Sequence, residues 1–286
     1  MTTRRQHYVW RHYLRAWATD EKIWCLRDEK KSLTNLVNIG QERDFYAVKD
    51  ITENDIKYII TMTESRHGGV LNDHNSEFIN LYKSVSALRM TESFNEKIKE
   101  FLIQFEEDVM CSIEQEGIQY LEMLHMEETG FFTEYSHRAK FSFFIMIQFI
   151  RTKRMSEKIK NTMRDHLAKR FVNVESVWSV EKYIDAGHLA LSLFSDNMYK
   201  IYLLKNDTEI PFITGDQPIF NTYGVGIGDS IPSETEFYYP ISPSLAVIIS
   251  KKEQPISAIV DSVHKYNSFV EEMAYEQIYA NEEAFL

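Results

Sequence analysis

A glutamine lies in the middle of the most apolar stretch of the chain, Phe141 to Ile150. A buried amide without a hydrogen-bond partner costs about 1–3 kcal/mol, so Gln148 is expected to meet another polar group. Arg151 and Thr152 follow within one helical turn on the same face. Because a guanidinium matches the paired oxygens of a carboxylate or phosphate, Gln148 and Arg151 are candidates to line an anion pocket. The more ordinary alternative is that Gln148 fixes the backbone of a nearby loop.

A second polar group ends the segment Phe212-Ile-Thr-Gly-Asp-Gln-Pro. Gly215 supplies backbone freedom and Pro218 forces the residue before it to be extended, which predicts a strand that enters a tight turn. A carboxylate at the end of a strand is held rigidly enough for catalysis. Equally often, an aspartate in this position closes a turn on its own backbone. Asp216 is therefore a candidate catalytic carboxylate, and Gln217 beside it a candidate substrate contact.

The N-terminal segment carries a third polar group, with Gln6, His7, Arg11 and Arg15 among aromatic residues. A histidine near a carboxylate can transfer protons, and arginines stabilise the charge that develops during phosphoryl transfer. We predict that this segment lies over a pocket formed by the other two groups. Such a site would suit a metal-independent phosphodiesterase or RNase. A histidine among aromatic rings is also commonly a packed, hydrogen-bonded residue.

Two sets of residues make up the predicted site. The predicted catalytic residues are His7, Gln148, Arg151 and Asp216. The predicted substrate-binding residues are Gln6, Arg11, Arg15, Arg154, Gln217 and Tyr239.

No cofactor motif is present, and the histidines lack the His-Glu-x-x-His spacing of a zinc enzyme. His67 and His74, with Asp73 between them, leave a divalent metal as an option without a defined ligand set. The two cysteines, Cys25 and Cys111, do not form a Cys-x-x-Cys pattern. They predict neither a disulfide framework nor a structural zinc site, and they favour a reducing, cytoplasmic location.

Local patterns predict a helical middle between strand-forming ends. Short β-prone segments separated by a charged turn predict a hairpin from Lys22–Leu26 and Leu33–Val37. Apolar residues at three- and four-residue spacings then predict a series of helices. These cover residues 52–67, 76–90, 93–128, 133–172 and 176–205, with strand character at 199–204. Further strands at 212–214, 236–239 and 245–249 precede a last helix from Asp261 to about Asn281.

The predicted fold class is α+β and predominantly α-helical. A central helical bundle would carry a small, mostly antiparallel sheet built from the N- and C-terminal strands. With 286 residues, 44% of them hydrophobic, the chain can bury a large core, and no linker suggests a boundary. We therefore predict a single domain over residues 1–286, with a helical middle at about 52–205 and β-rich parts at 20–40 and 208–252.

Charge and hydropathy restrict the partners. A net charge of −11 opposes general binding to nucleic acid, because like charges repel at long range. Basic clusters at Arg4–Arg15 and Arg151–Lys160 still allow a local basic pocket for a nucleotide or nucleic-acid end. The rest of the protein is acidic, and its surface would suit a protein partner. No run approaches the roughly 20 apolar residues that span a bilayer, and the start is no secretory signal, so no membrane partner is predicted. The oligomeric state is left open.

Short strings along the chain carry a family resemblance. They include Gln6-His7-Tyr8-Val9 with Tyr13-Leu14-Arg15, Lys22-Ile23-Trp24, Asp44-Phe45-Tyr46, Gly215-Asp216-Gln217-Pro218 and Tyr239-Pro240-Ile-Ser-Pro243. The chain resembles the DUF4238 family of uncharacterised bacterial proteins, whose members open with an HYVPxxYLRxF-like string and carry a GDNP-like turn. It departs from that pattern at Trp10, where the family has proline, and at Gln217, where it has asparagine. The resemblance indicates the family to which the chain is related, but it implies no particular reaction.

Two hypotheses of different class follow. In the first, the protein is a hydrolase of nucleic-acid or nucleotide phosphodiesters, acting as a bacterial toxin or phage-defence effector. In the second, it is a non-catalytic interaction or regulatory module whose polar motifs are structural. The hypotheses predict different geometries. The polar side chains border an open cavity in the enzyme, whereas in the module they satisfy one another in a closed network.

Overall fold

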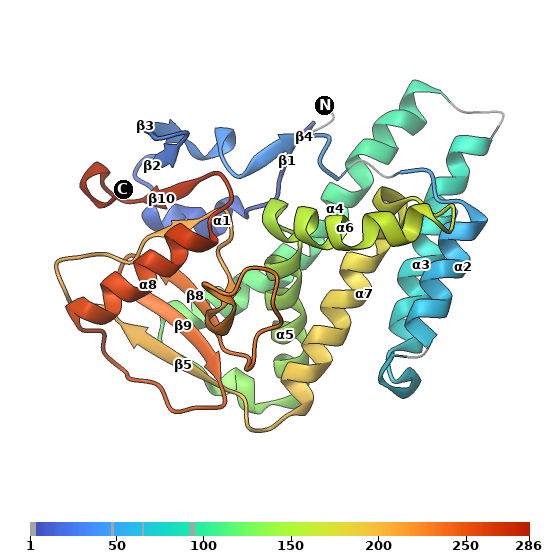
Figure 1. The fold of residues 1–286 in the computed structure, drawn as a ribbon. Coiled ribbons are helices and arrows are strands. Elements are labelled where there is room, and N and C mark those ends of the chain that lie inside the picture. Colours follow the sequence, from blue (N-terminus) through green and yellow to red (C-terminus); the bar gives the residue numbers. More distant parts are fainter. Residues whose placement is uncertain (1–3, 47–48, 65, 92–94) are drawn as a thin grey trace.

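The computed structural model describes residues 4–46, 49–64, 66–91 and 95–286. The helices of residues 53–195 gather on one side of the molecule, whereas the strands lie on the other side together with the helices of residues 11–14 and 260–273 (Figure 1). The fold is α+β and predominantly helical, as the sequence predicts. None of the helices in the described part of the chain is long and apolar enough to cross a membrane.

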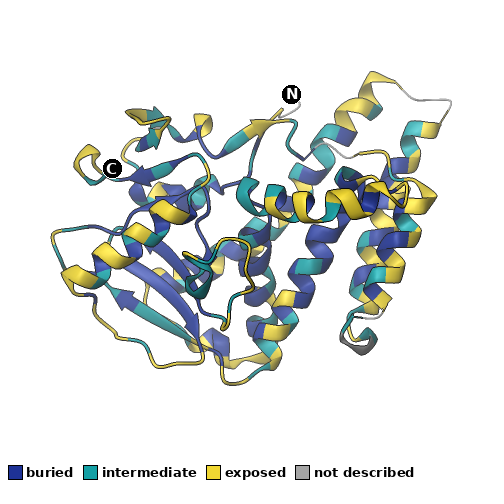
Figure 2. Cartoon of the chain, viewed as in Figure 1, coloured by how far each residue is buried: buried dark blue, intermediate teal, exposed yellow. Residues whose placement is uncertain are grey.

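The helical side is organised around one long buried helix. This helix, α7, packs along α5 and also contacts α2, α3 and α6. Most of its residues are buried, whereas the outer helices expose one face (Figure 2). The helices are α1 (Arg11–Leu14), α2 (Glu53–Glu64), α3 (Asn72–Ala87), α4 (Glu96–His125), α5 (Tyr135–Ile150), α6 (Lys153–Ala168), α7 (Val174–Ser195) and α8 (Val260–Met273).

The strands form three antiparallel sheets within the described residues, where the sequence predicted one. The predicted hairpin is β2 (Lys22–Arg27) with β3 (Lys30–Asn35). It joins two C-terminal strands in the order β3-β2-β10-β6, so strands from both chain ends pair as expected. A second sheet has the order β5-β9-β8-β7, and a third pairs β1 with β4. The remaining strands are β1 (Arg5–His7), β4 (Gln41–Arg43), β5 (Lys200–Lys205), β6 (Thr214–Gly215), β7 (Phe220–Asn221), β8 (Phe237–Ser242), β9 (Leu245–Ser250) and β10 (Ile278–Ala280).

One predicted helix, residues 133–172, is wrong because the chain turns at Arg151 and Thr152. Thr152 has extended backbone angles, and its hydroxyl accepts a hydrogen bond from the Met155 amide, so it caps a new helix. The apolar periodicity continues across this break, which is why the sequence pattern hid it. The break places Arg151 at a corner between α5 and α6.

The predicted last helix is also wrong beyond Met273. The chain leaves α8 there and returns as β10, which pairs between β2 and β6. The predicted helix 176–205 ends earlier, with α7 at Ser195, and the segment 199–204, for which strand character was predicted, overlaps the strand β5. The other predicted helix ends differ from the observed ones by a few residues, and residues 65 and 93–94 of those predictions lie outside the described ranges.

Candidate functional site

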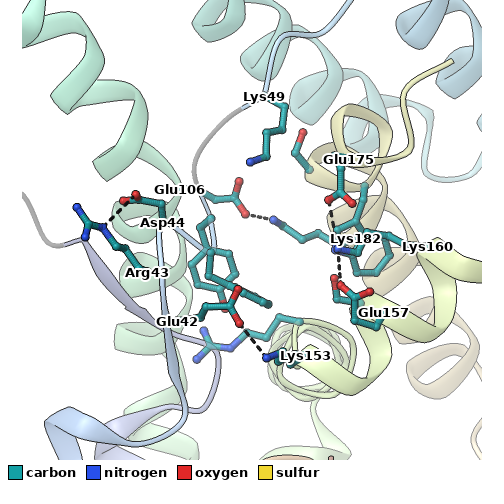
Figure 3. A pocket seen from close by; sticks show the side chains of 16 residues that line it. Glu42, Arg43, Asp44, Lys49, Glu106, Lys153, Glu157, Lys160, Glu175 and Lys182 are labelled. Carbon is teal, nitrogen blue, oxygen red and sulfur yellow. Dashed lines mark hydrogen bonds and ion pairs between the residues drawn. The ribbon is translucent and has the colours of Figure 1, made fainter. Parts of the chain in front are cut away.

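A cavity of about 310 Å³ opens between the segment after β4 and helices α4, α6 and α7. Acidic and basic side chains face one another across it (Figure 3). Its charged lining residues are Glu42, Arg43, Asp44, Lys49, Glu106, Arg151, Lys153, Glu157, Lys160, Glu175 and Lys182. The volume is within the range of small-molecule sites, at the lower end of about 300–1,000 Å³.

Two helices present their first turns to this cavity. The lining residues of α6 are at positions 153, 156, 157 and 160, and those of α7 at 175, 178, 179 and 182. Each set has the three- and four-residue spacing of one helix face. Thr152 caps α6, and Asn173 caps α7 by accepting a hydrogen bond from the Glu175 amide at 2.9 Å. Helix N-termini carry positive partial charge, so both favour an anion nearby.

Several cations in the cavity are held by carboxylates at its edge. Lys153 Nζ lies 3.0 Å from Glu42 and 2.8 Å from Glu276. Lys160 Nζ lies 2.8 Å from Glu157 and 3.2 Å from Glu175 (Figure 3). Each of these two amines is therefore paired with two carboxylates.

Arg151 is the most deeply buried cation of the lining, with a relative exposure of 1%. Its Nη2 lies 2.6 Å from the carboxylate of Glu114, and the same nitrogen donates weakly to the His7 carbonyl at 3.4 Å. Its Nε and Nη1 have no hydrogen-bond partner among the described residues. Burial opposes the charge, but the neighbouring Tyr46 and Glu114 outweigh it and raise the pKa of Arg151. Arg151 is therefore a charged guanidinium with donors to spare.

Lys182 and Glu106 form a buried ion pair across the cavity, from α7 and α4 respectively (Figure 3). Their relative exposures are 3% and 1%. The ammonium group also lies over the rings of Tyr46 and Tyr183, at 5.1 and 5.2 Å from the ring centroids. Burial lowers the pKa of Lys182 well below its ordinary value. An amine of this kind gives up its proton more readily than an exposed lysine does.

Glu107, the residue after Glu106 in the chain, also has a shifted pKa. Burial raises the pKa of Glu107 to about 7, with the Arg151 charge acting in the opposite direction. One of its carboxylate oxygens is buried without a hydrogen-bond partner in the described part of the chain. Glu107 is thus a titratable group whose charge interacts with that of Arg151.

A family model described as "Protein of unknown function (DUF4238)" matches residues 5–284 of this chain. The chain belongs to the DUF4238 family. The match confirms the resemblance that the motifs suggested and covers nearly the whole length. No curated protein and no solved structure gives a significant match.

The family's late turn, Gly-Asp-Gln-Pro in this member, is anchored by Asp216. Its carboxylate accepts hydrogen bonds from the backbone amides of Tyr275, Glu276 and Gln277 at 2.7, 2.8 and 3.2 Å. Asp216 is buried, and burial raises its pKa to about 6 against the effect of the three amides. The carboxylate thus holds the chain between α8 and β10, and it does not line the cavity.

Two glutamines tie other parts of the DUF4238 fold together. Gln217 accepts a hydrogen bond from the Thr152 hydroxyl and donates to the Phe149 and Ile219 carbonyls at 3.1 and 2.7 Å. Gln6 donates to the Ile103 carbonyl at 2.7 Å and accepts from the Tyr46 amide at 2.6 Å. Each amide is fully engaged with backbone or hydroxyl groups and buried.

The remaining predicted residues divide between the interior and the surface. Gln148 is buried, and its Nε2 has no hydrogen-bond partner in the described ranges. His7 is half-buried, and burial together with Arg11 and Arg151 lowers its pKa to about 4. Tyr239 is buried, with its ring stacked 5.0 Å from the Tyr13 ring.

The predicted surface arginines have structural partners. Arg11 and Arg15 pair with Glu21, at 3.3 and 2.6 Å. Arg154 donates to the Glu272 and Ala274 carbonyls at the end of α8. Within the predicted site, Arg151 is the residue that lines the cavity. Arg151 contacts the N-terminal segment through the His7 carbonyl, whereas the side chains of Asp216, Gln217 and Gln6 bind separate partners.

Sequence reasoning missed Lys182 and Glu106 as site residues. A signal was present for Lys182, since it lies among apolar residues in α7 much as Gln148 does in α5. The optional metal site is not supported by any group of three or more His, Cys, Asp or Glu residues in the described ranges. The side chain of His67 lies outside the described residues, and His74 packs on a different cavity.

Proposed function

We propose that the cavity binds a phosphate group of a nucleotide or nucleic acid, and that the protein cleaves phosphodiester bonds there. The observation that carries this proposal is the unused donor capacity of Arg151, a buried guanidinium in a lysine-lined cavity. A buried donor without a partner costs free energy, which a phosphate oxygen would recover. Lys153 and Lys160 would contact the other phosphate oxygens, each by exchanging one of its two carboxylate partners for the ligand.

The Lys182–Glu106 pair would supply proton transfer. In the ionic form Glu106 accepts a proton, and in the neutral form the Lys182 amine accepts it. The pair would take the proton from an attacking water or ribose hydroxyl as the new O–P bond forms. It would return that proton to the departing oxygen as the old O–P bond breaks. This chemistry requires no metal ligand from the chain.

The charge of the whole molecule favours a small or single-stranded substrate. A body with a net charge of −11 repels a long polyanion, while a short ligand needs only the local cations. We place this activity in the bacterial cytoplasm, in a toxin or phage-defence effector, consistent with the two free cysteines.

A non-catalytic module is the second candidate. The hydrogen bonds of Asp216, Gln217 and Gln6 favour it, because each side chain is bound mainly to backbone groups of another segment, as a structural role requires. In that case the acidic surface would serve a protein partner, and the cavity would bind a regulatory anion or none.

Binding to the double variant Arg151→Met/Glu114→Gln tests the proposal. Replacing both partners avoids an unpaired buried carboxylate, so the fold should survive. Hydrogen bonds to a charged group contribute about 1.5–3 kcal/mol, so affinity for a nucleotide should fall about 10- to 150-fold. Calorimetric titration with AMP, 2′,3′-cyclic AMP and the dinucleotide pApA measures this loss.

The matched control is Lys158→Met, which removes one cation from α6 outside the cavity lining. Its affinity should match that of the wild type within about twofold, because its charge is solvent-exposed and screened. Equal losses in both variants would indicate general electrostatic attraction and contradict a site at Arg151. Failure of the wild type to bind any of the three ligands would favour the module.

A further inference from the structure

An open hollow on the two-stranded sheet of β1 and β4 adjoins the cavity between α4, α6 and α7 (the Arg151 cavity). The hollow measures about 660 Å³ and shares Glu42 and Arg43 with that cavity. Figure 3 shows the Arg43 guanidinium beside Asp44 at the edge of the Arg151 cavity, away from Lys182. The two hollows therefore meet at β4. The residues that line the open hollow are Arg4, Arg5, Asn38, Gln41, Glu42 and Arg43.

The pairing of β1 with β4 sets two arginines against each other. Arg5 is the cross-strand partner of Arg43, and both residues are exposed. Like charges directly opposite one another in an antiparallel pair are destabilising. Arg5 Nη1 donates to the Asn38 side-chain oxygen at 3.2 Å, and no carboxylate pairs with Arg5 among the residues that the structure describes. Asp44 lies 3.7 Å from Arg43, but it already accepts two hydrogen bonds from Arg4.

The hairpin of β2 and β3 holds a similar cationic pair that is better compensated. Lys30 faces Arg27 across this hairpin, and Arg27 lies 3.9 Å from Asp28 and 3.5 Å from Glu276. Two carboxylates of the chain thus accompany that pair, whereas the Arg5–Arg43 pair shares one carboxylate with Arg4. An external anion would supply the negative charge that the open hollow lacks.

We propose that the open hollow binds a phosphate of a single-stranded oligonucleotide, another phosphate of which lies in the Arg151 cavity. This inference rests on the proposed function, because one strand must occupy both hollows. Guanidiniums bind phosphate oxygens through paired N–H donors, and Asn38 and Gln41 add amide groups suited to a sugar or a base. The shared rim at Arg43 favours a strand that continues from one hollow into the other over two separate small anions.

The dependence of affinity on ligand length and charge tests this inference. The probes are AMP and two 5′-phosphorylated tetraadenylates, one with phosphorothioate linkages, which keep their charge and resist cleavage, and one with neutral methylphosphonate linkages. Calorimetric titration of the full chain should show the phosphorothioate binding about two- to thirtyfold more tightly than AMP, as two exposed arginines allow. The methylphosphonate should bind like AMP, since it lacks the further charges.

Arg5→Glu replaces the like-charge pair by an ion pair with Arg43, so its melting temperature should be no lower than that of the wild type. The variant should lose the gain in affinity with length and keep the affinity for AMP, because Arg5 does not line the Arg151 cavity. The slope of log K against log salt for the phosphorothioate should become less negative by about 1.4, or about 0.7 for each arginine neutralised.

Lys30→Glu is the matched control, because it makes the same change opposite Arg27 and lines neither hollow. It should bind all three probes as the wild type does. A gain with length that survives in Arg5→Glu, or that the methylphosphonate shows equally, would overturn this inference. Tighter binding of tetraglutamate than of the phosphorothioate would overturn the assigned class of ligand.

The AMP titration separates this inference from the proposed function. Binding of AMP without a gain for the phosphorothioate would overturn the inference alone and leave the proposed function standing. Absence of binding by AMP and by both tetraadenylates would overturn the two together.

Discussion

Replacing the buried pair as Lys182→Met/Glu106→Gln is expected to reduce phosphodiester cleavage about 10²- to 10⁴-fold, the usual contribution of a positioned acid–base group. The change removes both members of the buried ion pair that the proposed mechanism uses for proton transfer. Nucleotide affinity should change far less than the rate, because Arg151 and the lysines of α6 are untouched. Single-turnover cleavage of a dinucleotide, with calorimetric titration of AMP, separates the two effects.

The pH profile provides a second readout of the same pair. Burial lowers the pKa of Lys182, so the amine reaches its neutral, proton-accepting form well below the pH at which an exposed lysine would. The value of kcat/KM should therefore rise with pH through the apparent pKa of the pair and then level off. Glu106 and the rings of Tyr46 and Tyr183 face the amine, and burial raises the pKa of both tyrosines above its usual range.

The single variant Lys182→Met should be less stable than the double one. It leaves the Glu106 carboxylate buried and unpaired, which costs about 3–5 kcal/mol in comparable pairs. The matched control is Lys205→Met, which breaks an exposed pair with Glu127 and should cost about 1 kcal/mol or less. Undiminished cleavage by the folded double variant would exclude the pair as the proton-transfer group.

The second large effect is on stability. Asp216→Ala should lower the free energy of unfolding by about 3–9 kcal/mol, since three backbone amides lose their acceptor at about 1–3 kcal/mol each. The loss would release the turn that connects α8 to β10 and thereby loosen the sheet to which β2 belongs. Urea denaturation followed by far-ultraviolet circular dichroism measures the change.

Asp229→Ala is the control for this prediction, because Asp229 is exposed and pairs with Lys158 at 3.5 Å. Its effect should stay within about 0.5 kcal/mol. A small effect of Asp216→Ala on stability, combined with loss of cleavage, would restore the catalytic role that the sequence suggested for this aspartate.

The pKa of Asp216 also predicts a pH dependence of stability. Burial raises this pKa to about 6, so between pH 4 and 6 the folded chain binds the proton more tightly than the unfolded chain. The contribution of this carboxyl to stability should therefore fall as pH rises through that window. Asp216→Asn should lack this step in a series of urea titrations between pH 4 and 7.

Several features followed from local sequence patterns. Alternation and turn chemistry around the charged segment 27–31 predicted the hairpin of β2 and β3, and helical spacing predicted most of the helices. The motif strings, including Gly215-Asp216-Gln217-Pro218, were sufficient to name the family. These properties depend on residues close together in the chain, so a sequence displays them directly.

The assignment of polar residues to a cavity or to the interior depended on the tertiary structure. Gln148 and Lys182 both lie in apolar helices, but of the two only Lys182 lines the cavity between α4, α6 and α7. Arg151, at the corner before Thr152, lines that cavity and pairs with Glu114 of α4, and the amides that Asp216 binds are about sixty residues away.

The sequence by itself determined the fold class, the family and the polar groups that would need partners. Only the tertiary structure decided which partners they found. The physical reason is that a hydrogen bond depends on positions in space, and contacts between distant segments leave no local periodicity. Asp216 meets the end of α8 and Lys182 meets Glu106 of α4 through such contacts.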